Sequence, residues 1–318
     1  MAFPPMLKLA LLLLAPFITI SVADQTPENQ QNPADGDDIL VIGTKTIKEA
    51  VGDFIDTTVA GPKGGRNVGQ YARFSAPICP KVFGFSQAND KAIEQRIRGV
   101  SLAADIRVGA EDCKPNVYVV VIDDGKSAIT MLRKKHHRIF GALPIYKRDQ
   151  LAESRGPVFS WKAIWTVSAN GTSIHTSDGG SSLASGTGGG LSDDRFAASR
   201  THVNSLIKQP VQEDMRASYL LLEKKALAGL TTLQIADYAA MHSLMETRAD
   251  PDQDAAFFSI LSLFKNKQAG RDIPDSISEW DLILLSALYS TPSDVRARMQ
   301  RSAMQQKFIK EVEAAQDQ

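Results

Sequence analysis

Two pairs of polar side chains are the residues of this chain that could hold a metal ion. His242 and Glu246 are four residues apart, so on a helix they would share a face and could supply two ligands to zinc. Asp123 and Asp124 follow an apolar run, and their carboxylates could bind Mg²⁺ or Ca²⁺. Each pair also has a simpler interpretation, an exposed His–Glu pair and a solvated Asp-Asp-Gly turn. We expect the simpler interpretations, and therefore no metal and no cofactor.

The usual catalytic motifs do not occur in the sequence. Catalytic zinc needs three protein ligands, HExxH is missing, and a third ligand would have to come from one of the other histidines: His136, His137, His175 or His202. No GxSxG nucleophile elbow is present. The Gly/Ser-rich segment 171–194 lacks the GxxxxGK[ST] pattern of a phosphate loop. We expect a protein that is not an enzyme.

The two cysteines, Cys79 and Cys113, indicate a structural disulfide. An even number of cysteines in an exported chain is typical of a disulfide, and the CxxC spacing of redox-active pairs is absent. Two free thiols are the alternative. On the chain-entropy model the closed loop would stabilise the fold by about 4 kcal/mol.

The first 23 residues have the three parts of an export signal. Lys8 supplies the positive charge, residues 9–20 are apolar, and Ala23 ends a group of small residues. The apolar run is shorter than the roughly 20 residues that cross a bilayer, which argues against a membrane anchor. We expect cleavage after Ala23 and a periplasmic or secreted product. Residues 24–38 are acidic and polar, which predicts a disordered linker.

Composition limits the class of partner. Lys plus Arg and Asp plus Glu number 36 each, so no basic field recruits nucleic acid. No segment after the signal is long and apolar enough to span a membrane. We expect an envelope protein or a small ligand as the partner.

The first half, residues 39–150, has the pattern of an α/β lobe. Amphipathic helices are predicted over Thr46–Val59 and Asn89–Asp105, and a helix over Lys126–Phe140. The β-branched run Val117–Ile122 lies between the last two and predicts a buried strand. A Cys79–Cys113 bond would clamp the second helix to that strand.

The second half, residues 151–318, predicts strands followed by helices. Residues 158–168 alternate as a half-buried strand, and Tyr219–Leu222 is a short buried strand. A helix capped by Thr231 follows, and the expected inward face consists of Leu233, Ala236, Ala240 and Leu244. Three more helices are expected: Asp254–Lys265, Glu279–Tyr289, and a last one beginning with Pro292 as its first residue. The fold class is α+β, with a mixed α/β first lobe and a helical C-terminal half.

Several segments resemble a family of uncharacterised exported proteins from Gram-negative bacteria. The segments are ARFSAPICP, VYVVVIDD after DCKPN, LQIADYAAM, SILSLF and WDLILLSALYSTP, and the resemblance covers the chain from about residue 38 to 291. The layout of the second half is distantly similar to zincin metallopeptidases, without HExxH. The resemblance implies an exported protein and carries no site residues.

Three functional hypotheses remain. The first is a non-enzymatic binding or accessory protein of the cell envelope. The second is a divergent metal-dependent hydrolase. The third comes from Ile39–Gly43, which follows an acidic segment and is similar to a TonB box, a strand that docks on an envelope partner. The simpler interpretation of that segment is the first strand of the domain.

Overall fold

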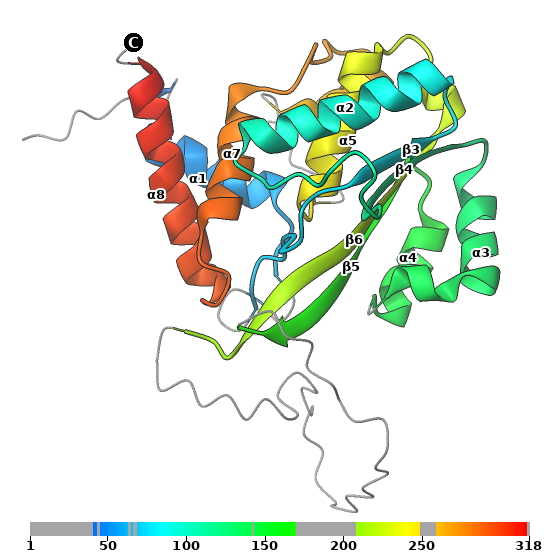
Figure 1. The fold of residues 1–318 in the computed structure, drawn as a ribbon. Coiled ribbons are helices and arrows are strands. Elements are labelled where there is room, and N and C mark those ends of the chain that lie inside the picture. Colours follow the sequence, from blue (N-terminus) through cyan, green and yellow to red (C-terminus); the bar gives the residue numbers. More distant parts are fainter. Residues whose placement is uncertain are drawn as a thin grey trace, which may run out of the picture. The chain divides into compact units, whose positions relative to one another are not determined.

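A four-stranded mixed sheet lies at the centre of the fold (Figure 1). Its strands are β3 (Pro80–Phe83), β4 (Val117–Ile122), β6 (Val211–Glu223) and β5 (Val158–Ser168), in that spatial order. The first three are parallel, and β5 runs antiparallel to β6. A short hairpin of β1 (Val41–Ile42) and β2 (Lys45–Thr46) stands apart from this sheet.

This computed structural model describes residues 41–42, 45–62, 65, 69–141, 143–169, 208–248 and 259–316. The expected signal peptide, the linker 24–38 and the Gly/Ser-rich segment 171–194 lie outside the described residues, as does the start of the helix expected from Asp254. Of the TonB-box-like segment, only Val41 and Ile42 are described, and they form β1.

The sheet gives the fold its mixed α/β class, as the sequence predicts, and it draws on both halves of the chain. The two strands β4 and β6 come from the expected first and second lobes, and they pair directly in the sheet from Val117↔Ser218 to Ile122↔Glu223. Residues 40–318 accordingly form one compact unit, and the two lobes that we expected share a single sheet.

Helices cover one face of the sheet, and the larger hydrophobic core lies on this side. α2 (Gln87–Ala103) connects β3 to β4 and packs against α5 (Thr232–Leu244), which follows β6 and the 3₁₀ turn Lys224–Leu227. The sequence places apolar residues of both helices toward this core, among them Ile93 and Ile97 of α2. These two helices therefore form the layer nearest the strands.

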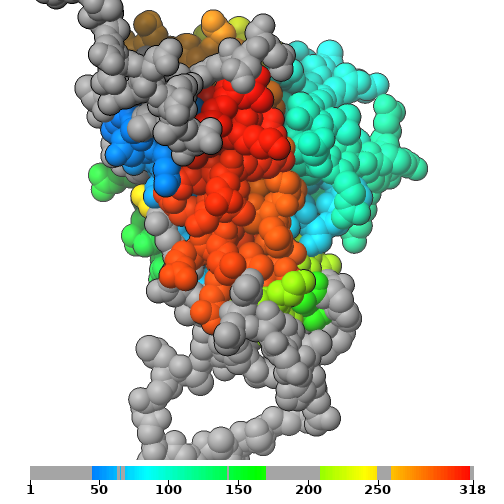
Figure 2. Space-filling view, turned by 90° about the vertical axis from the view of Figure 1, so that its left-hand side faces the viewer, coloured from blue at the N-terminus to red at the C-terminus, as the bar shows by residue number. Residues whose placement is uncertain are grey.

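The remaining helices of this core lie farther from the sheet. α1 (Ile47–Thr58) and α7 (Glu279–Ser290) pack against α8 (Ala297–Gln316), which Figure 2 shows in red along the surface of the molecule. The turn Ile260–Ser262 leads into the short α6 (Leu263–Gln268) beside α5. Phe54, Trp280 and Phe308 meet edge to face and join three of these helices.

A smaller core covers the opposite face of the sheet. α3 (Gly125–Lys135), the 3₁₀ turn His137–Phe140 and α4 (Ile145–Glu153) lie on this side (Figure 1). Phe140 stacks on Trp161, and Trp161 stacks on Tyr219, so the layer is joined to the strands by aromatic contacts. The helix expected over Lys126–Phe140 is thus a helix and a separate turn.

The capping signals in the sequence are confirmed, whereas the predicted start of the last helix is wrong. Capping boxes formed by Thr46 with Glu49 and by Thr231 with Gln234 begin α1 and α5. Pro292 does not begin a helix, because the chain only turns after it and Val295 then forms a bridge with Lys208 beside the sheet. α8 starts only after this bridge, at Ala297.

The disulfide between Cys79 and Cys113 is present, with the two Cα atoms 6.0 Å apart. It joins the residue before β3 to the loop before β4, and the segment that it closes contains α2. The expected disulfide is therefore confirmed, but it joins the segments before two neighbouring strands and does not itself hold α2 against β4.

The central helix α5 is buried on more sides than the sequence pattern indicates. All residues from Gln234 to Met241 are buried, because the sheet, α2 and α7 surround the helix. Leu233, which we expected to face the core, is 44% exposed in the first turn. The inward position of Ala240 is confirmed, since its side chain is fully buried.

We predict that Ala240→Asp destabilises the fold by about 3–5 kcal/mol, because it places an unpaired carboxylate in the core. Leu233→Asp is the matched control on the same helix, and should change the free energy of unfolding by no more than about 0.5 kcal/mol. Urea denaturation of both variants measures the difference. Similar losses in the two variants would contradict the packing of α5.

Candidate functional site

The carboxylates at the carboxyl ends of the parallel strands hold the first turn of α3. Oδ1 of Asp124 accepts a hydrogen bond of 2.6 Å from the Ser127 amide and caps the helix, and this bond lowers the pKa of Asp124. Oε1 of Glu223 accepts from the Gly125 amide at 3.0 Å. A side chain at Gly125 would overlap the ring of Phe159, so the chain requires glycine there. Asp123 is exposed.

These contacts add to the interpretation of Asp123 and Asp124. Asp123 lies in a bend between β4 and α3 and both aspartates are exposed, as expected for a solvated turn, and the carboxylate of Asp124 in addition satisfies an amide of the helix N-terminus. Asp124 therefore has a structural role at the start of α3.

His242 and Glu246 do not share a helix face. α5 ends at Leu244 and Met245 is extended, so the four-residue spacing does not place Glu246 on the same helix face as His242. The His242 ring lies against Tyr238 with centroids 4.5 Å apart, and its Nδ1 is 3.0 Å from the Thr247 hydroxyl. Burial, together with the charge of Lys162, lowers the pKa of His242 to about 3. The imidazole is thus neutral and engaged in packing.

Lys162 is the residue of this region that sequence reasoning missed. It lies on β5 with a side chain turned toward α5, and only 6% of the residue is exposed. Its Nζ donates to the Ser160 hydroxyl at 3.0 Å and to the main-chain oxygen of His242. Burial lowers the pKa of Lys162 to about 7, and the negative charge of Glu246 opposes this shift.

The contact between Lys162 and the His242 carbonyl has a structural purpose. The last carbonyls of an α-helix have no partner within the helix, and the C-terminus attracts positive charge. A lysine on the sheet therefore caps the C-terminal turn of α5 and fixes that helix to β5. This anchor lies at the end of the helix opposite to its capping box.

Two buried hydroxyl groups complete what we call the Lys162 cluster: Ser160, Lys162, Ser218, His242 and Ser243. Ser218 lies opposite Lys162 in the register of β5 and β6, and Ser243 follows His242 on α5. Neither Oγ has a hydrogen-bond partner among the described residues, although both are fully buried. Buried hydroxyls without partners are rare in folded proteins, so this cluster is the candidate functional site.

The cluster can support one kind of chemistry. An amine with a pKa near 7 is neutral in a large share of molecules at neutral pH, and a neutral amine can accept the proton of a neighbouring hydroxyl. Ser160 is partly exposed and is the hydroxyl in contact with that amine. A serine beside a neutral lysine is one of the recognised arrangements of an activated nucleophile.

The alternation of β5 concealed this site in the sequence. Phe159, Trp161 and Trp165 alternate with smaller and polar residues, so the pattern predicted a half-buried strand with its polar side toward solvent. In the structure α5 covers that side, and Lys162 is buried. On the other side of the strand, Trp161 is buried and Trp165 is 41% exposed.

Comparisons with known proteins return no match, whether with protein-family models, curated proteins or solved structures. Among the described residues, no three side chains of His, Cys, Asp or Glu gather in a way that could hold a metal ion. In the same part of the chain, no helix has both the length and the apolar character needed to cross a bilayer.

We predict that Lys162 makes stability depend on pH. The unfolded lysine titrates near 10.5 and the folded one near 7, so between these values the unfolded chain binds more protons, and stability rises with pH. The folded chain is most stable with respect to this group above pH 10.5, where the lysine is neutral in both states. Stability decreases as the pH falls to 7, because the buried lysine resists protonation, and below pH 7 this loss of stability is constant. The whole window corresponds to on the order of 5 kcal/mol.

Denaturation curves from pH 7 to 10.5 measure this effect. Lys162→Met should reduce the slope, whereas Lys134→Met, which changes an exposed lysine on α3, should preserve it. Equal slopes in wild type and Lys162→Met would show that the lysine is not buried as described.

Proposed function

We propose that this chain is an exported, non-enzymatic binding or accessory protein of the cell envelope. The observation that carries the proposal is the Cys79–Cys113 disulfide, because such bonds form and persist in oxidising compartments outside the cytosol. The signal-like residues 1–23 support the same compartment. The balanced charge of the chain favours a protein or small-ligand partner over nucleic acid.

The roles of the polar candidates support the non-enzymatic part of the proposal. Asp124 and Glu223 bind amides of α3, and His242 contacts Thr247 and Tyr238. Each of these contacts has a structural explanation. The TonB-box-like interpretation of residues 39–43 stays a further proposal about docking, whereas the pairing of Val41 and Ile42 with β2 favours the simpler interpretation, the first strand of the domain.

The mature protein, purified from the envelope fraction of its own host or an expression host, tests this proposal. We expect an N-terminus at Asp24, and an unreduced mass lower by two hydrogens than that of the reduced chain. Thiol alkylation without reductant should label neither cysteine. An intact Met1 or two alkylated thiols would contradict export. Stoichiometric zinc that is lost in His242→Ala would favour the metal-dependent hydrolase instead.

A second candidate function is acyl transfer by Ser160, and one observation favours it. The Lys162 amine lies 3.0 Å from the Ser160 hydroxyl, and burial lowers the pKa of that amine to about 7. In this scheme Ser160 attacks a carbonyl carbon as Lys162 takes the hydroxyl proton, and the same proton then passes to the leaving group.

Labelling by a fluorophosphonate separates the two functions. A binding protein should show no labelling above that of Ser160→Ala. An acyl transferase should be labelled at Ser160, and labelling should disappear in Lys162→Met and in Ser160→Ala. Ser302→Ala, which changes an exposed serine of α8, is the matched serine control and should leave the labelling unchanged. Ser160 labelling that survives Lys162→Met would refute the role of the lysine.

A further inference from the structure

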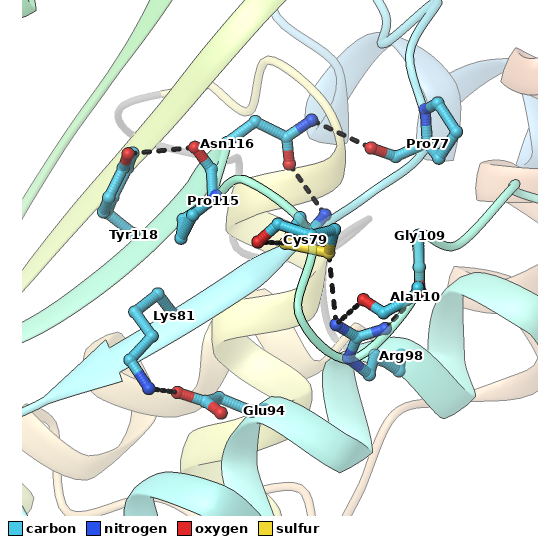
Figure 3. Close-up of a disulfide and its surroundings, with 11 residues drawn as sticks. Pro77, Cys79, Lys81, Glu94, Arg98, Gly109, Ala110, Pro115, Asn116 and Tyr118 are labelled. Atoms are coloured by element: carbon cyan, nitrogen blue, oxygen red, sulfur yellow. Dashed lines mark hydrogen bonds and ion pairs between the residues drawn. A yellow bond between two sulfur atoms is a disulfide. The ribbon is translucent and has the colours of Figure 1, made fainter.

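The two sulfurs of the disulfide lie in different surroundings (Figure 3). Cys79 is 3% exposed and lies directly before β3. Cys113 is only partly buried and lies in a loop whose neighbours Glu111, Asp112 and Lys114 are exposed. A reagent in solution therefore reaches the sulfur of Cys113 first.

Arg98 places a positive charge beside one of these sulfurs. From α2, its Nη1 donates to the carbonyl of Gly109 at 2.6 Å, and its Nη2 donates to that of Ala110 at 3.1 Å. The same Nη2 lies 3.4 Å from Sγ of Cys113. Two carbonyls of the loop thus hold the guanidinium in place, so its position does not depend on the bond between the sulfurs.

Cys79 has the opposite environment. Its Sγ lies 2.9 Å from the carbonyl oxygen of Cys113, which disfavours negative charge on that sulfur. Its amide donates to Oδ1 of Asn116 at 2.8 Å, and the amide group of Asn116 donates to Pro77, so the backbone at Cys79 is fixed. Burial favours the neutral thiol over the thiolate. In the reduced chain, negative charge is therefore favoured at Cys113 and disfavoured at Cys79.

We propose that Arg98 makes Cys113 the sulfur through which this disulfide forms, with a small disulfide or the disulfide of an oxidoreductase as the oxidant. The Cys113 thiolate attacks one sulfur of the oxidant, and the other sulfur leaves as a thiolate. The Cys79 thiol loses its proton to solvent and attacks Sγ of Cys113, which expels the remaining thiolate. Two electrons pass from the cysteine pair to the oxidant, which becomes two thiols. Arg98 contacts the attacking sulfur and stabilises its negative charge.

The inference does not depend on the proposed binding function, because it concerns only the maturation of the chain. It also assigns an order to the two cysteines that their sequence positions do not reveal. Cys113 is the exposed entry point, and Cys79 is the buried resolving thiol.

Single-cysteine variants with oxidised glutathione as the probe test the proposal. Cys79→Ser leaves Cys113 alone, and Cys113→Ser leaves Cys79 alone; mixed-disulfide formation is followed by mass spectrometry across pH. A cation that lowers a thiol pKa by one unit raises its thiolate fraction about tenfold and lowers its nucleophilicity about threefold. We therefore expect Cys113 to react at least about threefold faster than Cys79 at pH 7.

The pH profile distinguishes a charge effect from a structural one. The midpoint, the pH at which the reaction rate of Cys113 is half maximal, should lie below the pKa of an ordinary thiol, which is about 8.5. Arg98→Gln should move the midpoint up, Arg98→Lys should restore part of the shift, and Arg107→Gln, at a nearby arginine that binds Ser75, should leave it in place. In urea the two cysteines should react at equal rates.

Two results would overturn the proposal. Equal rates for the two cysteines under native conditions would show that Cys113 does not react first. An unchanged midpoint in Arg98→Gln would show that the guanidinium does not stabilise the thiolate. If a single-cysteine variant does not fold, the reduced wild-type chain is exposed briefly to oxidised glutathione, quenched with acid and mapped by peptide. Glutathione found first on Cys79 would again contradict the inference.

Discussion

The buried carboxylate of Asp237 is the interaction on which the helical layer depends. The side chain is fully buried in the middle of α5, and it accepts two hydrogen bonds from Arg96 of α2, at 2.6 and 3.1 Å. Its Oδ2 also accepts from the Ile277 amide at 2.8 Å, just before α7. One carboxylate thus fixes the two helices that cover the sheet and the entry into a third. Because a buried charge without partners is costly, these three segments must assemble together.

The same principle recurs at the other loops of this face. Asp281, also fully buried, accepts from the Ser259 hydroxyl and from the amides of Ile260 and Ser278. Burial raises the pKa of Asp281, and these hydrogen bonds oppose that shift. Gln300 of α8 accepts from the Tyr71 amide and donates to Pro292. Apolar packing forms the layer, and these few polar side chains determine the position of each connecting segment.

Local signals were readable from the sequence, and long-range contacts were not. The capping boxes of Thr46 and Thr231, the buried strand at residues 117–122 and the disulfide depend on nearby residues or on compartment, and they are correct. The face of a strand that a distant helix covers cannot be read in this way. Lys162 was therefore missed, since its burial depends on α5, some 70 residues later in the chain. For the same reason the spacing of His242 and Glu246 indicated a shared helix face, although the helix ends between them.

The hairpin of β5 and β6 has a consequence for protein engineering. The amide of Ala169 donates to the carbonyl of Pro210 at 2.9 Å, so the chain leaves the sheet and returns to it at a single pair of residues. Extra flexible residues inserted there would add little to the cost of bringing the strands together, because loop-closure entropy grows only with the logarithm of length. This junction is therefore a natural place to insert an affinity tag or a fluorescent domain.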